Sequence, residues 1–466
     1  MAEAKRPNVV VFFTDTQRWD CSSLHGNPLE LMPNFDRYAS RGTHLYHAIS
    51  PQPVCTPCRA CLQTGMYGTQ TGVYRNGIAL PEESRTLAHF FGEAGYDTAY
   101  IGKWHLANEE MGVHAAGAVP KRLRGGYDYW LGANAIELVS HPYRCVVYDE
   151  DDNEVVLPGY RVDALTDAMI RYIDRPHEKP FYLFFSLLEP HSQNHLGSYV
   201  APDGYRERYA GRWTPPDLAG LAYTNAGELG NGEKAQHGLG DYWGMVKRID
   251  EALGRLMDAL KSKGMDRDTI VLFAADHGTH FGTRNRGAKC SPHEASVRVP
   301  VALWGEKFDG GGRIEEMVSV LDLAPTLLDA CGIAVPEQMM GHSVLQLTRG
   351  ERDGWQEDVF TQVSQLEVGR YVRTRRWKYG VTAPDKNGWR DMGSDRYVDA
   401  VLYDMQNDPY ELVNLIGFAS HTPVVRRMRE RLLERMAAAG EAAPVIEDAP
   451  ERKAGQRHLD EGDIDA

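Results

Sequence analysis

The amino-acid sequence predicts an α/β fold in which helices flank a large mixed, mainly parallel sheet, followed by a smaller C-terminal α+β domain. Three observations predict it: short segments that are apolar on both faces recur along the chain, a helical pattern lies between them, and short β-like segments take over after about residue 355. A chain of 466 residues that is 42% hydrophobic can bury a large core, and its length favours two or three domains.

The buried strands are expected where continuous apolar runs occur. Helices cover both faces of a parallel sheet, so its strands are apolar on both faces, whereas a half-exposed strand alternates. An amphipathic helix is predicted over 242–261, where apolar residues recur with the 3.6-residue period. Strands and helical patterns that alternate in this way are typical of a parallel sheet. The predicted strands are 8–13, 98–101, 181–185 and 269–273.

The change of pattern divides the chain into three parts. We expect residues 1–354 to form the α/β domain and 355–440 to form the smaller domain, in which β-like segments precede a helix over 424–438. Residues 441–466 are acidic and poor in large apolar side chains, so we expect a mobile tail.

Two stretches rich in Gly, Pro and Tyr, 107–160 and 194–236, are expected to be long loops. Long loops serve as binding elements or as contacts between subunits. A homo-oligomer is therefore compatible with this sequence.

The charge and the cysteine content argue against several classes of protein. The formal net charge of −14 makes a nucleic-acid partner unexpected. The apolar run at 9–13 is too short for a membrane span or for the core of a signal peptide, so we expect a cytoplasmic protein without a membrane partner, although a removed leader would also fit. Seven cysteines, an odd number, argue against a disulfide framework.

The most informative segment is PVCTPCRACLQTG, which begins at Pro53. Its cysteines Cys55, Cys58 and Cys61 have a C-x2-C-x2-C spacing that could bind a metal through thiolates. A fourth ligand is missing, because the other cysteines are scattered along the chain. Three buried thiols near the start of a helix are the plainer alternative.

The pattern C-x-P-x-R that begins at Cys55, followed by LQTG, resembles the signature of the type I, formylglycine-dependent sulfatases of the alkaline phosphatase superfamily. In that family a maturating enzyme oxidises the first cysteine to formylglycine. Most members have serine where this chain has Cys58. The resemblance implies an alkaline-phosphatase-like fold, sulfuric ester hydrolase activity, a catalytic domain over 1–354 and a formylglycine-generating enzyme as a partner.

Further segments match the family in the same order along the chain. They are FTDTQR, KWH, EPH and ADHG, followed by a lysine and by two landmarks of the smaller domain. Taken alone, an aspartate after a strand is usually a turn residue, and the combination is what points to a site. The resemblance implies metal ligation by Asp15, Thr16, Cys55, Asp276 and His277, catalytic roles for Cys55, Arg59, Lys103, His105, His191 and Lys289, and substrate binding by Lys103, His191, Lys289, Asn76 and His195.

The family resemblance implies a divalent metal ion, and we expect Ca²⁺. This chain departs from the usual ligand set, because Thr16 replaces an aspartate and His277 replaces an asparagine. The exchange removes one carboxylate and adds a nitrogen, which leaves Mn²⁺ and Mg²⁺ as alternatives.

Elementary chemistry agrees with these roles. A sulfate ester gathers negative charge in the transition state, and cations aimed at that charge stabilise it. Arg59, Lys103 and Lys289 can supply such charge, alongside a divalent metal. The mechanism implied by the resemblance uses a hydroxyl of hydrated formylglycine as the nucleophile, with His191 or Lys289 assisting the leaving oxygen and His105 accepting a proton.

Other functions remain open at this point. Phosphonate or phosphate ester hydrolases of the same superfamily can share the C-x-P-x-R pattern, but the phosphonate monoester hydrolases have smaller or neutral hydroxyl side chains at the positions of Lys103 and His105. A non-catalytic binding protein should have lost its nucleophile or its cations, and both are present here. We expect an oligosaccharide or other carbohydrate sulfate as substrate, with a small aryl or alkyl sulfate as the alternative.

Overall fold

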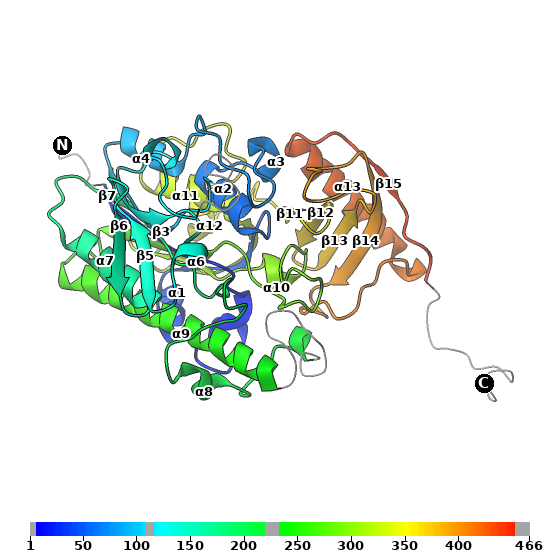
Figure 1. Cartoon of the computed structure of the whole chain (residues 1–466). Coiled ribbons are helices and arrows are strands. Elements are labelled where there is room, and N and C mark those ends of the chain that lie inside the picture. The colour runs from blue at the N-terminus through cyan, green and yellow to red at the C-terminus, as the bar shows by residue number, and fades with distance from the viewer. Residues whose placement is uncertain (1–5, 108–115, 220–232, 453–466) are drawn as a thin grey trace.

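The computed structural model describes residues 6–107, 116–219 and 233–452 and contains two sheets (Figure 1). The large sheet has ten strands among the described residues. In spatial order they are β10 (Gly312–Ser319), β2 (Thr43–Ile49), β9 (Val301–Trp304), β8 (Thr269–Ala275), β1 (Asn8–Thr14), β7 (Phe181–Ser186), β3 (Asp97–Lys103), β4 (Tyr129–Ala133), β5 (Arg144–Tyr148) and β6 (Glu154–Pro158).

The centre of this sheet is parallel. Strands β8, β1, β7, β3 and β4 run in one direction, and the antiparallel pairings involve β9 and the β5–β6 hairpin. Every residue of β1, β7 and β8 is buried. The predicted fold class and all four predicted strands are therefore confirmed.

The alternation of side chains along β1 divides the core in two. Val10 and Phe12 point into a layer shared with α1 (Pro33–Arg41), α7 (Arg161–Asp174) and α9 (Glu233–Ser262). Val9, Val11 and Phe13 point to the opposite face, into a layer shared with other helices. Figure 1 shows the two sets of helices on opposite sides of the sheet. The helices of the second layer are α2 (Cys55–Thr64), α4 (Leu87–Glu93), α11 (Leu323–Ala330) and α12 (Leu345–Thr348).

Short helical segments join these elements. The short α-helices are α3 (Gly68–Thr71), α6 (Ile136–Val139), α8 (Tyr205–Tyr209) and α10 (Glu294–Val297). The 3₁₀ segments are Trp19–Cys21, Ser23–His25, Lys121–Leu123, Pro216–Leu218, Val320–Asp322 and Ala419–His421.

The smaller C-terminal domain is built on a second sheet. α13 (Thr422–Ala438) covers it with Val425, Met428, Leu432 and Met436, which are spaced as one helical stripe. The strands are antiparallel except for the last pair. In spatial order they are β11 (Asp358–Val363), β12 (Gly369–Thr374), β13 (Trp377–Thr382), β14 (Arg396–Asp404) and β15 (Val445–Glu447).

The expectations for the two long loops and for the tail need correction. The stretch 107–160 contains β4 and the β5–β6 hairpin, in which short apolar strands flank an acidic turn. The stretch 194–236 contains α8 and the start of α9. Strand β15 pairs with β14, so the beginning of the predicted mobile tail belongs to the second sheet, and residues 453–466 lie outside the described residues.

A buried charge network joins the two domains. Glu294 on α10 of the large domain accepts from Lys378 Nζ at 2.9 Å and from Arg373 Nε at 3.2 Å, and both cations belong to the second sheet. Lys378 also pairs with Glu411 at 2.6 Å. Side chains with at most 4% exposure make all these contacts, so the network fixes the smaller domain against the segment that carries the candidate site.

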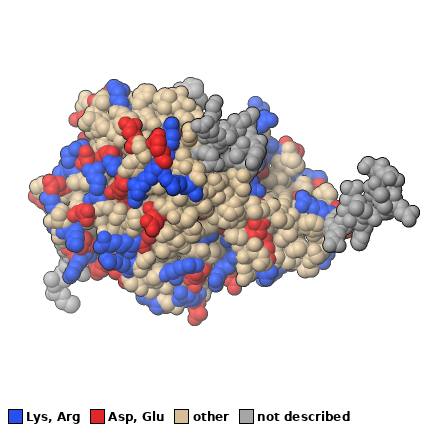
Figure 2. Space-filling model, turned by 90° about the horizontal axis from the view of Figure 1, so that it is seen from below, with Lys and Arg blue, Asp and Glu red and all other residues tan. Residues whose placement is uncertain are grey.

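The surface carries both signs of charge. Lys and Arg alternate with Asp and Glu on the face seen in Figure 2, and no broad single-sign face is visible there. Among the described residues, none of the helices combines the length and the apolar character that a membrane span requires.

Candidate active site and metal centre

The polar residues of the site gather where neighbouring parallel strands end. Asp15 follows β1, Asp276 and His277 follow β8, and Lys103 is the last residue of β3. His191 follows β7 by a short turn in which its N–H donates to the Leu188 carbonyl at 3.0 Å. Because these strands are adjacent, their C-terminal ends meet at one edge, where α/β sheets bind ligands.

Cys55 is the first residue of α2, a helix of the second layer, and reaches this edge of the sheet from that side. Its side chain is 1% exposed. Arg59 stands one turn further along the same face of the helix. Its guanidinium donates to Asp15 Oδ2 at 3.0 Å and to Ser186 Oγ at 2.8 Å. The helix thus delivers the cysteine and a cation together.

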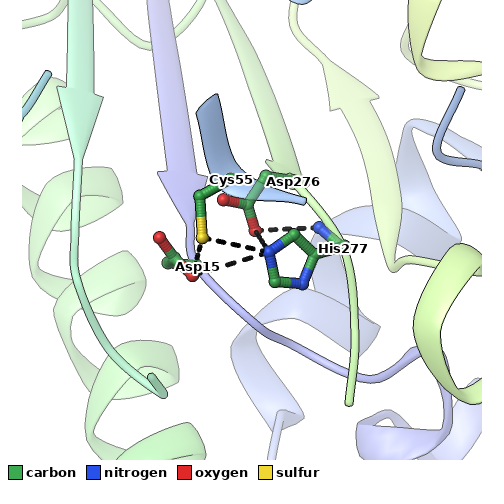
Figure 3. Close-up of side chains that lie close together, drawn as sticks. All are labelled: Asp15, Cys55, Asp276 and His277. Atoms are coloured by element: carbon green, nitrogen blue, oxygen red, sulfur yellow. Dashed lines mark hydrogen bonds and ion pairs between the residues drawn. The ribbon is translucent and has the colours of Figure 1, made fainter. Parts of the chain in front are cut away.

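Asp15, Cys55, Asp276 and His277 form one compact group, shown in Figure 3. One ligand atom of each lies within 4.8 Å of the others. Cys55 Sγ is 3.2 Å from His277 Nε2 and 3.5 Å from Asp15 Oδ1. His277 Nδ1 donates to the Gly278 carbonyl at 2.9 Å, which leaves the lone pair of Nε2 directed at the group.

The residues of this group fit a divalent cation. Asp276 Oδ2 is buried and makes no hydrogen bond, and the Arg59 guanidinium lies 3.3 Å from it as an ion pair. Burial and the charge of Asp15 raise the pKa of Asp276 to about 7. Burial opposes ionisation of Asp15 as well, but Lys103 and His191 hold its pKa well below the usual range. Two buried carboxylates and a neutral imidazole are a donor set that a bound cation would satisfy.

Thr16, the other predicted ligand, contacts the two carboxylates. Its hydroxyl donates to Asp15 Oδ1 at 2.6 Å, and its N–H donates to Asp276 Oδ1 at 3.0 Å. The residue adopts φ = +65°, which turns the chain sharply after β1. Thr16 orients both carboxylates, and its own coordination of a metal stays a prediction.

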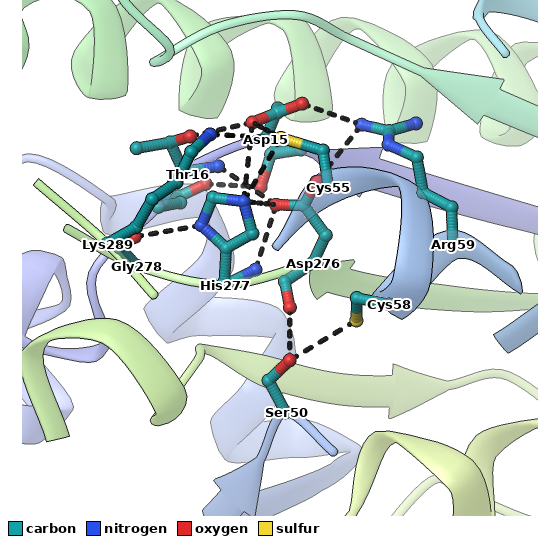
Figure 4. Close-up of polar contacts among 12 residues, drawn as sticks. Asp15, Thr16, Ser50, Cys55, Cys58, Arg59, Asp276, His277, Gly278 and Lys289 are labelled. Atoms are coloured by element: carbon teal, nitrogen blue, oxygen red, sulfur yellow. Dashed lines mark hydrogen bonds and ion pairs between the residues drawn. The ribbon is translucent and has the colours of Figure 1, made fainter. Parts of the chain in front are cut away.

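Two lysines complete the positive side of the site, and Figure 4 shows one of them beside the cysteine. Lys289 Nζ donates to Cys55 Sγ at 3.0 Å. Lys103 Nζ donates to Asp15 Oδ2 at 2.8 Å and to Glu137 Oε1 at 2.9 Å. The predicted cations Arg59, Lys103 and Lys289 therefore all surround the group at Cys55.

Glu137 is a site residue that the sequence did not reveal. It is the second residue of α6, the short helix that follows β4, and is 4% exposed. Its Oε2 is buried without a hydrogen bond. Burial opposes its ionisation, but Lys103 and His105 lower its pKa to about 2. An acidic residue between apolar neighbours just after a strand was the only available signal.

The protonation of the nucleophile and the histidines follows from burial. Burial and the charge of Asp15 raise the pKa of the Cys55 thiol to about 12, so the unmodified thiol stays protonated at neutral pH. Burial and Lys103 lower the pKa of His105 to about 3. Burial and Lys289 lower the pKa of His191. Both imidazoles are therefore uncharged at neutral pH.

Of the remaining predicted site residues, Asn76 lies beside the nucleophile segment and His195 lies at the surface. Asn76 Oδ1 accepts from the N–H of Thr56, the residue after Cys55, at 3.0 Å. His195 is exposed, and its Nε2 lies 2.8 Å from His141 Nδ1. The neighbouring cysteines are buried thiols. Ser50 Oγ donates to Cys58 at 3.3 Å, and among the described residues Cys55 is the only cysteine in a group of metal-ligating side chains.

Comparison with known proteins agrees with the family resemblance seen in the sequence. The model of the sulfatase family matches residues 7–333, and the C-terminal model of N-sulphoglucosamine sulphohydrolase matches residues 288–438. An ulvan-active sulfatase of Formosa agariphila is 28% identical over 457 residues, which cover 94% of this chain and 83% of that protein.

Two solved structures have a similar fold. One was determined in complex with its substrate D-glucosamine-2-N,6-O-disulfate; its TM-score is 0.76 at 22% identity, covering 94% of this chain and 98% of that chain. A phosphonate monoester hydrolase of Agrobacterium radiobacter has a TM-score of 0.72 at 22% identity, covering 93% of this chain and 96% of that chain. At these identities the likeness concerns the fold.

Proposed function

This chain belongs to the sulfatase family and is a sulfuric ester hydrolase, and we propose that it releases sulfate from a carbohydrate sulfate ester with a formylglycine made from Cys55. The observation that supports the proposal most strongly is the position of Cys55. Its Sγ lies between the imidazole of His277 at 3.2 Å and the ammonium of Lys289 at 3.0 Å, above two buried carboxylates.

A modified residue is needed here because the thiol itself is a poor nucleophile. The raised pKa of Cys55 keeps it protonated. Hydrated formylglycine supplies two hydroxyls on one carbon, one to attack sulfur and one whose deprotonation expels sulfate. A formylglycine-generating enzyme is the corresponding partner.

The surrounding cations would stabilise the charge that develops on the sulfate oxygens. Lys103 and Lys289 hold ammonium groups on the site, and Arg59 holds a guanidinium. Arg59 and Lys103 are buried and Lys289 is half-buried, so their charges act in a region of lower dielectric, where they are more effective than in water.

The proton transfers can be assigned to groups around the nucleophile. His191 Nδ1 donates to the Ser192 carbonyl at 2.6 Å, which leaves Nε2 as the exchanging atom. We assign His191 together with Lys289 to the leaving oxygen, with Lys289 as the group that carries a proton at neutral pH. We assign His105, which burial and Lys103 keep uncharged at neutral pH, as the acceptor of the proton from the second hydroxyl.

The proposed metal ligands are Asp15, Asp276 and His277, with the modified Cys55 as a fourth. A divalent cation there supplies positive charge that lowers the pKa of the attacking hydroxyl. We propose Ca²⁺. Metal analysis of protein purified without added cations tests this choice, and stoichiometric Mn²⁺ or Mg²⁺ would contradict it.

A carbohydrate sulfate is proposed as the substrate because relatives act on such compounds. The Formosa agariphila relative is described as ulvan-active, and a structural neighbour has a glucosamine disulfate as its substrate. Phosphonate ester hydrolysis would use the same cluster of residues, so it belongs in the same assay as a competing reaction.

The test combines peptide mass spectrometry across Cys55 with turnover assays on a sugar sulfate, an aryl sulfate and an aryl phosphonate ester. Protein co-expressed with the maturating enzyme should show a loss of about 18 Da at Cys55, the change on which this activated nucleophile depends. Sulfate turnover should exceed phosphonate turnover. An unmodified Cys55 in fully active enzyme would overturn the proposal.

A further inference from the structure

Three large apolar side chains stand exposed on neighbouring loops of the smaller domain. Leu366 is 44% exposed, Trp389 48% and Met392 41%. Leu366 follows β11, and the other two lie between β13 and β14. Single exposed apolar residues are ordinary, but a group that includes a tryptophan marks a surface that binds something.

The tryptophan is held in a fixed turn. Asn387 Oδ1 accepts from the Trp389 N–H at 2.9 Å, and the Asn387 carbonyl accepts from the Arg390 N–H at 2.8 Å. Tyr74 of the large domain donates to the Arg390 carbonyl at 3.1 Å. An indole presented in this way loses little conformational entropy when a ligand binds.

The loop with Trp389 packs tightly on the loop with Leu366. The Gln365 N–H donates to the Gly388 carbonyl at 3.0 Å. A Cβ at Gly388 would lie 2.5 Å from the Glu367 carbonyl oxygen, so only glycine permits this approach. The two loops therefore form one surface.

The two loops contact two segments of the active site. Gln365 Oε1 accepts from the Asn76 N–H at 3.0 Å, and Asn76 in turn accepts from the N–H of Thr56, next to Cys55. On the other side, a Cβ at Gly287 would lie 2.4 Å from Leu366 Cδ1, two residues before Lys289. The exposed group thus borders both segments that carry the reacting side chains.

We propose that Trp389 is a stacking platform for a non-reacting sugar unit of a sulfated oligosaccharide, adjacent to the sulfated unit held at Cys55. The C–H face of a pyranose packs well on an exposed indole. Arg75, whose guanidinium lies 6.0 Å from the Trp389 ring centroid, borders the platform. This proposal rests on the proposed function, because it names the kind of substrate that the sulfatase site takes.

The contacts of these loops with the segments of the site favour this occupant. A protein partner would need a larger apolar area than three side chains provide, whereas we expect a sulfated oligosaccharide bound at Cys55 to extend onto loops that contact the segments of Asn76 and Lys289. Capture of an aryl sulfate needs no such platform, so the platform distinguishes the two substrate classes.

The kinetic test compares Trp389→Ala with the parent enzyme on size-defined sulfated tetrasaccharides from heparin and from carrageenan, and on an aryl sulfate. KM for the accepted tetrasaccharide should rise about tenfold with kcat unchanged, the loss expected for one aromatic contact. Values for the aryl sulfate should not change. Trp389→Phe should recover part of the loss, since it keeps an aromatic face.

Val156→Ala is the control variant. Val156 is 47% exposed on β6, at the sheet edge furthest from the smaller domain, so its loss should leave every parameter unchanged. Equal melting temperatures of the variants exclude misfolding. An equal rise in KM for the aryl sulfate, or no rise for the tetrasaccharides, would overturn the platform.

Binding without turnover separates this inference from the proposed function. Tetrasaccharide titrations of the Cys55→Ala protein, followed by tryptophan fluorescence, should give a Kd that Trp389→Ala weakens about tenfold. If the parent enzyme hydrolyses no sulfate ester yet this binding difference is found, the proposed function fails and the platform stands. If the parent enzyme hydrolyses sulfate esters but Trp389→Ala weakens binding of none of the tetrasaccharides, the proposed function stands and the platform fails.

Discussion

Glu137 Oε1 lies 2.9 Å from the Nζ of Lys103, and the other oxygen of the same carboxylate makes no hydrogen bond. Lys103 is therefore shared between two carboxylates, because Asp15 holds it from the other side at 2.8 Å. Glu137 and Asp15 thus hold the ammonium group of Lys103 from two sides.

Glu137→Gln should lower kcat about 10- to 100-fold, the usual cost of removing a group that orients a site residue from behind. KM should change less, because Lys103 keeps its contact with Asp15. Separate kcat and KM values on the sugar sulfate check this. Glu137→Asp should restore part of the rate, and a Gln variant with the parent's kcat would show that Lys103 needs no second partner.

Cys58→Ser should leave turnover unchanged and lower the free energy of unfolding by about 1 kcal/mol, since the new hydroxyl is buried but can pair with Ser50. Cys55→Ala should instead abolish turnover in a folded protein. Turnover assays and denaturant titrations on both variants make the comparison. Loss of bound iron or zinc on the Cys58 change would point back to a thiolate cluster.

Glu294→Gln should cost about 3–5 kcal/mol of stability, because it leaves the buried cations Arg373 and Lys378 without their shared carboxylate. Urea denaturation followed by tryptophan fluorescence measures the loss. Glu351→Gln serves as the control, because its pairing with Arg349 is fully exposed and should contribute nothing measurable. Equal midpoints for the two variants would mean that the network between the domains is dispensable.

Stability should fall in mild acid because of His44. Burial and the charges of Arg313 and Arg298 lower its pKa to about 4, and its Nε2 faces His25 at 3.1 Å. In the unfolded chain His44 has a pKa of about 6.5, so below that pH the unfolded chain binds a proton that the folded protein does not. The contribution of neutral His44 to the free energy of unfolding is therefore complete above about pH 6.5 and is lost as the pH falls toward 4. The loss for this one group is about 3 kcal/mol.

Denaturation curves at pH 7, 5.5 and 4.5 for the parent and for His44→Gln check this dependence. The variant should be less sensitive to acid, because glutamine does not titrate. The difference between the two proteins isolates His44 from the carboxylates and from His25 and His47, which titrate in both. Parallel losses in the two proteins would assign the acid sensitivity to other groups.

The centre of the fold was predictable because burial on both faces leaves a clear trace in the sequence. The four predicted strands became β1, β3, β7 and β8, with boundaries that moved by only a few residues. The predicted helix at 242–261 proved to be the second part of α9, whose first turns are polar and lack an apolar stripe. Where the periodic signal was absent, the predicted helix began too late.

The site was predictable where its residues follow strands that the sequence already revealed. Asp15, Asp276 and Lys103 met because adjacent parallel strands end together. Glu137 was missed, because its strand β4 lies in a region interpreted as a loop. The role proposed for Trp389 was equally hidden, since only tertiary packing brings its loop beside Tyr74 and Arg75.

Asp15, Asp276 and Lys103 stand at the ends of the central strands and Cys55 begins α2, whereas Gln365 and Trp389 come from loops of the second sheet, across the buried Glu294 network. Chemistry and recognition are therefore encoded in separate stretches of the gene. A lineage can lengthen or replace the loops between β11 and β14 and so acquire a new sugar, while the machinery that breaks the ester is inherited unaltered.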